Sequence, residues 1–146
     1  MKAEQIHLVK ETWVQVVPIA DTAAELFYSR LFTIDPTTRT LFRATDMREQ
    51  RRKLVQVLSV AVNGLGKVDT LVATVEELGR RHAGYGVTDT HYDSVGAALL
   101  WALGHGLGPS WTSAAADAWA HAYGLLAGIM RRAAREAEVA RAAPAL

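Results

Sequence analysis

The chain has 146 residues, half of them hydrophobic, and a formal net charge of +1. This length suits one folded domain with a real core, and the apolar content excludes a disordered chain. The near balance of charges predicts no strong electrostatic attraction to nucleic acid or to an anionic membrane. The absence of cysteine excludes disulfides, cysteine-ligated zinc and cysteine-linked prosthetic groups.

The N-terminal stretch MKAEQIHLVKETW is charged and amphipathic, unlike the unbroken apolar core of a signal peptide. The longest apolar stretches, 54–62 and 97–107, are shorter than the roughly 20 residues that a membrane span needs. We therefore expect a cytoplasmic protein with one domain over residues 1–146 and no membrane partner.

The helix-breaking prolines and glycines are few and well separated, which predicts an all-α fold. Helices are expected at 3–17, 19–35, 47–65, 69–83, 89–106 and 110–140, with a short helical turn after Pro36. Residues 131–146 are rich in alanine, arginine and glutamate, and we expect them to form a solvated, fraying extension of the last helix.

Most of these segments carry an apolar stripe at spacings of three and four residues. Three stripes contain a polar side chain where a hydrocarbon would pack more easily: Tyr28, Gln50 and His82. Burying such a group without a partner costs about 1–3 kcal/mol. Each therefore has a hydrogen-bond partner inside the protein or belongs to a functional site.

His82 follows Leu78 on its stripe, and two glycines follow it within four residues. A histidine near a helix C-terminus can donate one ring N–H to a carbonyl of the preceding turn. Its other nitrogen then stays free as a neutral base, which an axial iron ligand requires. The alternative is a core histidine with both nitrogens satisfied.

The remaining histidines predict no helical metal pair, and no H-E-x-x-H motif occurs. His7 and His121 are expected on solvated faces, His91 opens the fifth helix, and His105 lies in a glycine-rich helix end. Tyr28 alone could be a core tyrosine and Gln50 a solvated residue of a first helical turn. Phe42 is by default a core aromatic residue.

Taken together, four stretches resemble the bacterial single-domain haemoglobins, which are related to the globin domain of flavohaemoglobins. They are ELFYSRLFTIDPTTRTLF (25–42), QRRKLVQVL (50–58), LGRRHAGYGVTDTHYDSVG (78–96) and DAWAHAYGLLA (117–127). None is diagnostic alone, but their order and spacing over more than 100 residues are specific. The resemblance implies a globin fold of six to eight helices around non-covalent haem b.

The resemblance also implies roles for individual residues. His82 matches the proximal iron ligand, while Tyr28 and Gln50 match the distal donors to bound O2. Glu49 is the alternative to Gln50, because the preceding stretch varies in length among relatives. Arg81 matches a basic residue that can face a haem propionate. The other positions matched to the pocket are Leu41, Phe42, Leu54, Leu58, Val87, Tyr92, Val95 and Tyr123.

The chain departs from the family pattern at one proximal position. Many relatives carry a glutamate on the last helix that acts with the tyrosine matching Tyr92, and in register that place falls on Ala134. Without the acid, we expect a less electron-rich histidine, which argues against peroxidase-like activity. The chain also carries no FAD- or NADH-binding module, so reduction of its iron would need a separate reductase.

The resemblance implies reversible O2 binding with high affinity, with NO and CO as further ligands. On this interpretation, O2 binding serves either O2 storage and delivery or NO dioxygenation. A gas or redox sensor, or an electron-transfer globin that acts through a partner protein, is the alternative. Oligomeric state stays open between a monomer and a homodimer.

Overall fold

The structure is a computed structural model that describes residues 1–142. Over that range the chain forms six α-helices and four short 3-10 segments and contains no strand. In chain order the elements are α1 (Ala3–Val16), η1 (Val17–Ile19), α2 (Ala20–Ile34), η2 (Pro36–Phe42), α3 (Met47–Gly64), η3 (Leu65–Lys67), α4 (Val68–Gly84), α5 (Asp89–Leu107), η4 (Gly108–Ser110) and α6 (Ser113–Ala142).

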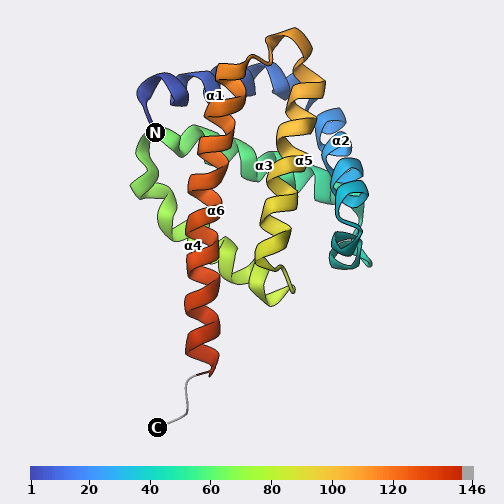
Figure 1. Cartoon of the computed structure of the whole chain (residues 1–146), viewed down its shortest axis with the longest axis vertical. Helices are drawn as coiled ribbons and strands as arrows, with labels where there is room; N and C mark the ends of the chain where they lie inside the picture. Colours follow the sequence, from blue (N-terminus) through green and yellow to red (C-terminus); the bar gives the residue numbers. More distant parts are fainter. Residues whose placement is uncertain (143–146) are drawn as a thin grey trace.

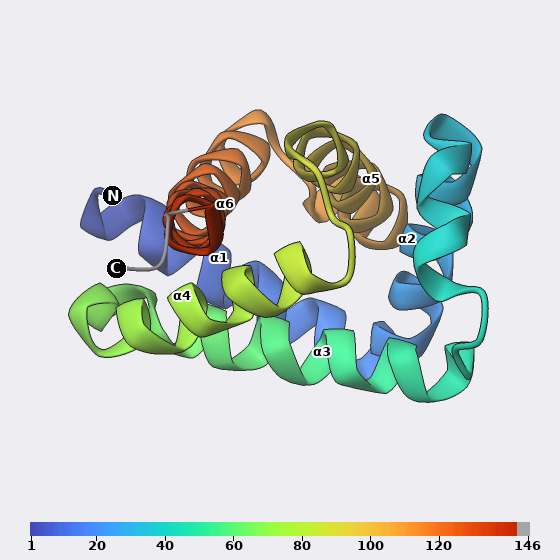
Figure 2. The ribbon, with the colours of Figure 1, turned by 90° about the horizontal axis from the view of Figure 1, so that it is seen from below.

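Helices α5 and α6 run antiparallel side by side, and α1 crosses them near one end (Figure 1). Seen along α6, helices α3 and α4 lie one above the other beneath this pair (Figure 2). The most extensive pairings join α4 to α6 and α2 to α5. In Figure 2, α2 lies next to the start of α3, and α4 runs back over α3 so that its end lies near the middle of the view, below α5.

The sequence-based expectation of an all-α architecture is confirmed, and each helix boundary lies within three residues of its expected place. The expected break near residue 65 is only the 3-10 turn η3, because Gly64 keeps right-handed helical angles there (φ −91°, ψ −3°). With α3, η3 and α4 counted as one helical stretch, the described residues hold five long helices, fewer than the six to eight expected.

This stretch, Met47–Gly84, is long and apolar enough to cross a membrane by length and composition alone. One such stretch is weak evidence, because core helices of globular proteins pass the same test. Figure 2 shows that it changes direction at η3, so that α4 returns along α3. Its two helices also pack against α1 and α6.

Two apolar clusters form the core. The larger joins α1, α2, α5 and α6 around Val9, Leu31 and Ala98. In its centre the Trp119 indole N–H donates to the Thr12 hydroxyl over 2.7 Å, which satisfies a buried donor that apolar neighbours could not. The smaller cluster lies between α4, α5 and α6, and it fixes the end of α4 that carries His82.

Gly79 sets the distance between α4 and α6. It is buried, and a Cβ added there would lie 2.4 Å from the Met130 carbonyl oxygen and 2.7 Å from its Cα. Both contacts are with backbone, which cannot rotate away. The α4–α6 pairing therefore depends on a residue without a side chain, three positions before His82.

We expect Gly79→Ala to destabilise the fold by about 1–3 kcal/mol, because overpacking forces the two backbones apart. Urea unfolding measures this change. Gly128→Ala on α6 is the matched control, since a Cβ there meets nothing within 4 Å. Alanine favours a helix over glycine, so the control should be neutral or slightly stabilising. Equal effects of the two substitutions would contradict a close approach at Gly79.

Candidate functional site

Tyr28 and Gln50 meet at the crossing of α2 and α3. The Gln50 side-chain Nε2 donates to the Tyr28 hydroxyl oxygen over 3.1 Å. The two residues are 22 positions apart, so the fold brings them together rather than local geometry. Glu49, the alternative to Gln50, instead pairs with Arg52, whose Nε lies 3.1 Å from the Glu49 carboxylate. Gln50 is thus the residue of this turn that faces Tyr28.

The bond leaves donors available. The Tyr28 hydroxyl accepts from Gln50, so its own proton is not used in that contact, and the Gln50 amide keeps a second N–H. Burial raises the pKa of Tyr28, and the bond from Gln50 lowers it by less. Tyr28 therefore stays protonated at neutral pH. The pair forms a compact, uncharged donor group.

Aromatic rings surround the Tyr28 ring. Phe27 packs edge-on against it at 4.8 Å between ring centres, and Phe42 of η2 does so at 5.4 Å. Phe32 lies 6.1 Å away. Phe42 and its neighbour Leu41 are half-buried. These contacts restrict the ring of Tyr28, so the direction of its hydroxyl is set by packing as well as by Gln50.

His82 lies one turn from the end of α4. Its Nδ1 lies 2.7 Å from the Leu78 carbonyl oxygen, and because a carbonyl only accepts, Nδ1 must carry the proton. Within residues 1–142 no hydrogen bond engages Nε2, which stays an unprotonated base. Burial lowers the pKa of His82 and the bond to Leu78 raises it by less. The imidazole is therefore neutral, the form that binds a metal ion.

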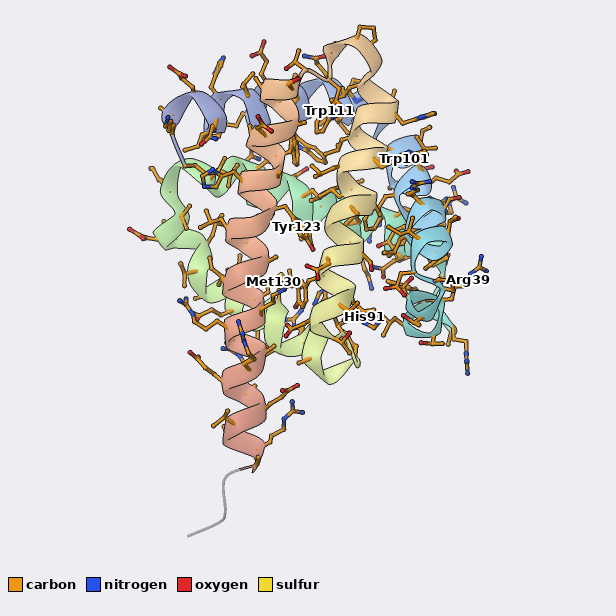
Figure 3. The ribbon with its side chains drawn as sticks, in the orientation of Figure 1. Arg39, His91, Trp101, Trp111, Tyr123 and Met130 are labelled. Atoms are coloured by element: carbon orange, nitrogen blue, oxygen red, sulfur yellow. The ribbon has the colours of Figure 1, made fainter. Side chains whose placement is uncertain are left out.

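Two tyrosines lie beside the end of α4. The Tyr123 hydroxyl donates to the backbone oxygen of Tyr92 over 2.5 Å. Gly96 makes room for this, because a Cβ there would lie 2.7 Å from the Tyr123 ring. Figure 3 shows Tyr123 on α6 next to α5. The Tyr92 hydroxyl is buried and has no hydrogen-bond partner among residues 1–142, which marks it as a donor with an unfilled role.

Arg131 lies over the ring of Tyr92. Its guanidinium carbon lies 5.1 Å from the Tyr92 ring centre, and its Nη2 is 2.8 Å from the Asp93 carboxylate and 3.1 Å from the Asp89 carbonyl oxygen. Ala134, one turn further on, is half-buried and is the residue that the resemblance matches to the acid of many relatives. The charged neighbour of Tyr92 is thus a cation.

Two small apolar cavities adjoin α3. Leu54 lines a cavity of about 20 Å³ that also reaches Phe27 and Leu99. Leu58 lines both this cavity and a second one, of about 30 Å³, which extends to Tyr123. Both have almost purely apolar walls. Apolar surfaces of this kind hold water poorly, so both cavities favour a dry interior.

The remaining expected pocket residues differ in position. Val87 packs in the smaller core cluster, and its N–H donates to the His82 carbonyl over 3.0 Å. Val95 packs against the larger cluster. Arg81 is exposed and lies 3.7 Å from the Glu77 carboxylate. Among residues 1–142 no hydrogen bond joins the Tyr28–Gln50 pair to His82, so the site consists of two separate groups.

These features define a class of protein: a helical fold with one neutral histidine, a free Nε2, and an uncharged donor pair among apolar walls. The chain belongs to the globin family, since the family model described as Globin matches residues 25–130. The sequence-based resemblance is thereby confirmed at the level of the family.

The chain is 28% identical over 124 residues to the flavohemoprotein of Bacillus subtilis (strain 168). This match covers 84% of the chain but 31% of that relative's length. In fold it is similar to a bacterial globin from Campylobacter jejuni, with a TM-score of 0.82 and 24% identity, over 94% of this chain and 99% of that one.

A hexacoordinated haem protein from an anhydrobiotic tardigrade gives a TM-score of 0.82 at 18% identity, over 92% of this chain and 96% of that one. A Drosophila melanogaster globin gives a TM-score of 0.80 at 17% identity, over 90% of this chain and 94% of that one. Identities this low establish the fold alone. Together with the family match they make the chain a globin, for which haem is the indicated prosthetic group.

The residues present fit that group. His82 offers a free Nε2 with its other nitrogen fixed by Leu78, which is the arrangement that a metal-binding histidine needs. The buried Tyr92 hydroxyl lacks a partner in the described part of the chain. The Tyr28–Gln50 pair supplies neutral donors, and Leu54 and Leu58 of α3 supply apolar surface.

Sequence reasoning missed two polar groups of the described chain. Arg131 was placed in the solvated tail, yet it is largely buried against Tyr92. His91 was seen only as the start of a helix, yet its ring nitrogens bond to Thr88 and Thr37. One signal for His91 was available, because Thr88-x-x-His91 has the spacing of a capping box.

Asp35 lies next to His91's partner Thr37. Hydrogen bonds from Thr37 and Ser94 lower the pKa of Asp35 below the ordinary value, which is about 3.9. The folded state therefore binds fewer protons than the unfolded chain near that pH. The stability that Asp35 contributes is present above about pH 4 and is lost as the pH falls through its lowered folded pKa.

We expect Asp35→Asn to be less stable than the natural protein at pH 6, with the difference shrinking as the pH is lowered from 4 to 2. Urea midpoints measured at each pH test this. A difference that stays constant down to pH 2 would mean that the Asp35 carboxylate is not preferentially stabilised in the fold.

Proposed function

We propose that this globin binds haem b non-covalently through His82 and binds O2 reversibly, with Tyr28 and Gln50 as the donors that retain the gas. The observation that carries the proposal is the 3.1 Å bond from Gln50 to Tyr28, which leaves the phenol proton free. When bound, haem supplies an iron atom that coordinates a diatomic gas.

The two donors favour slow release. A hydrogen bond contributes about 0.5–1.5 kcal/mol, and more when its acceptor carries charge. Each 1.4 kcal/mol corresponds to a factor of ten in an equilibrium constant. Tyr28 and Gln50 are both neutral hydrogen-bond donors. They can therefore stabilise electron-rich bound O2 without placing a charge in the path of NO, which is uncharged. The apolar cavities around Leu54 and Leu58 keep water away.

Slow release favours NO dioxygenation over O2 delivery. That reaction consumes O2, NO and one electron and gives nitrate, so it needs a reductant. The flavohemoprotein relative is about three times as long as the matched segment, since this chain corresponds to 31% of it. We infer that a separate reductase supplies the electron. The cysteine-free composition suits a cytoplasmic setting.

The surroundings of His82 oppose peroxidase-like chemistry. Its Nδ1 proton goes to the Leu78 carbonyl, a neutral acceptor, rather than to a carboxylate. The position in register with the family's acid is Ala134, and Arg131 places a positive charge beside Tyr92. His82 therefore keeps a neutral imidazole and donates less electron density than an imidazolate would.

The test is an absorption spectrum of the purified protein, supplied with haem if required, reduced without air and then exposed to O2. A broad five-coordinate ferrous spectrum and a stable oxygenated form would support the proposal. A sharp six-coordinate ferrous spectrum would instead support sensing or electron transfer through a partner protein. A protein that takes up no haem would overturn the proposed function.

A further inference from the structure

A cluster of polar side chains joins the start of α5 to the start of η2. It consists of Asp35, Thr37, His91 and Ser94, which we call the α5–η2 clasp. The Thr37 hydroxyl lies 3.1 Å from His91 Nε2, and the Ser94 hydroxyl donates to the Asp35 carboxylate over 2.7 Å. These contacts span 54 and 59 residues of sequence.

The donor and the acceptor of each hydrogen bond in the clasp can be assigned. The Thr88 backbone N–H donates to His91 Nδ1 over 3.0 Å, so Nδ1 is unprotonated and Nε2 carries the proton. Nε2 therefore donates to the Thr37 hydroxyl oxygen. The Thr37 proton is then free to go to the Asp35 carboxylate, which it contacts. One assignment of protons therefore satisfies every hydrogen bond of the clasp.

His91 performs two tasks with its two nitrogens. It is the third residue of α5 after the cap Thr88, a position where glutamate or glutamine commonly completes a capping box. Either of those would serve the cap. The histidine ring also carries an N–H on its far side, which reaches across to η2. Figure 3 shows His91 low on α5, toward the segment that carries Arg39.

The clasp acts on the segment that carries Phe42. Asp35 caps η2, because its side chain accepts from the Thr37 backbone N–H. Seven residues after Asp35, Phe42 packs edge-on against Tyr28 at 5.4 Å. Apart from the clasp, η2 packs chiefly against α2. The clasp thus ties η2 and its cap to α5 through side-chain hydrogen bonds.

We infer that Asp35, Thr37, His91 and Ser94 are positioning residues for Tyr28: by anchoring η2 to α5, they hold Phe42 against the Tyr28 ring. The hydroxyl is thereby kept where Gln50 bonds to it. This role deepens the proposed function and rests on it for its gas-binding consequence. The clasp also links the Tyr28 side of the site to α5, where Tyr92 follows His91 directly.

Thr37→Val removes the shared hydroxyl while keeping the shape of the side chain and the His91 cap. We expect O2 dissociation from the haem-loaded protein to become about two- to fivefold faster. The reason is that a displaced Tyr28 loses part of the free energy of its hydrogen bond to O2. His91→Gln, which retains an acceptor for Thr88, should shift it in the same direction. Thr40→Val is the matched control, since among residues 1–142 the Thr40 hydroxyl bonds only to the Thr37 carbonyl within η2.

The decisive measurement repeats Thr37→Val in a Tyr28→Phe background. If the clasp acts through Tyr28, its effect on O2 dissociation disappears there, whereas a merely structural effect would persist. An unchanged rate in the single variant, or an equal change in both backgrounds, would overturn the inference.

A second readout separates this inference from the proposed function. NMR of the protein as isolated should show the ring resonances of Tyr28 and Phe42 shifting in Thr37→Val but not in Thr40→Val. This result does not depend on gas binding, so it would support the clasp even if the absorption spectrum overturned the proposed function. Unshifted rings would overturn the clasp even in a protein that binds O2.

Discussion

Replacement of His82 by alanine is expected to abolish haem ligation while leaving the helical fold in place. Loss of a hydrogen-bond partner behind a metal ligand typically weakens metal binding 10–100-fold. Loss of the ligand itself should therefore raise the haem dissociation rate more than about 100-fold. Transfer of haem to an excess of an acceptor protein, followed by absorption, measures this rate.

The location of His82 makes the substitution selective. The side chain is half-buried and its single hydrogen bond goes to Leu78 in its own helix. Its removal breaks no contact between helices of the kind that Gly79 or Tyr123 make. Far-UV circular dichroism of His82→Ala should accordingly match that of the natural protein.

Two controls sharpen the result. His121→Ala removes an exposed histidine from α6 and should leave haem dissociation unchanged. His82→Gly opens a space in which added imidazole can take the place of the side chain, so imidazole should restore the ferrous spectrum. If His82→Ala released haem as slowly as the natural protein, or if His82→Ala and His121→Ala released it equally fast, another residue would be shown to bind the iron.

The helices could be predicted closely because their limits are local. Pro18, Pro36 and the Gly84–Gly86 pair mark helix ends through their own backbone preferences, whatever the rest of the fold does. The exception is η3, where Gly64 and Gly66 allow the backbone to tighten and turn without leaving the helical region. A glycine permits both outcomes, so the sequence does not distinguish them.

The central site residues could also be predicted, because each interrupts an apolar stripe of its own helix. The bond from His82 to Leu78 was expected for the same reason, since residues four apart share a helix face. The haem-ligand role of His82 and the donor roles of Tyr28 and Gln50 stay predictions that the variants described above and below test.

Contacts between distant segments could not be predicted. Arg131 has an ordinary place in an alanine-, arginine- and glutamate-rich helix, and only the α5–α6 packing brings it to Asp93, 38 residues away. The same holds for His91 and Thr37, at 54 residues. Gly79 gives no local sign of its close approach to Met130. Such features depend on the geometry of helix pairs, which single-helix periodicity does not contain.

Replacement of Tyr28 by phenylalanine is expected to speed O2 dissociation about tenfold, the equivalent of one hydrogen bond of about 1.4 kcal/mol. Phenylalanine keeps the ring contacts with Phe27 and Phe42 and removes only the hydroxyl. The pocket should therefore keep its shape and lose a donor. Stopped-flow replacement of O2 by CO measures the rate.

Gln50→Leu should change the rate in the same direction, but its effect cannot simply add to that of Tyr28→Phe. The two side chains bond to each other over 3.1 Å, so each single variant also changes the orientation of the donor that remains. A double variant whose rate equals the product of the two single effects would contradict the contact between them.

CO provides an internal control for both variants, because it is a weaker hydrogen-bond acceptor than bound O2. Its dissociation rate should change much less than that of O2 in Tyr28→Phe and in Gln50→Leu. Tyr85→Phe, which alters a tyrosine that is 70% exposed, should change neither rate. Equal acceleration of CO and O2 would point to a wider pocket rather than a lost donor, and an unchanged O2 rate in Tyr28→Phe would remove Tyr28 from the gas-binding site.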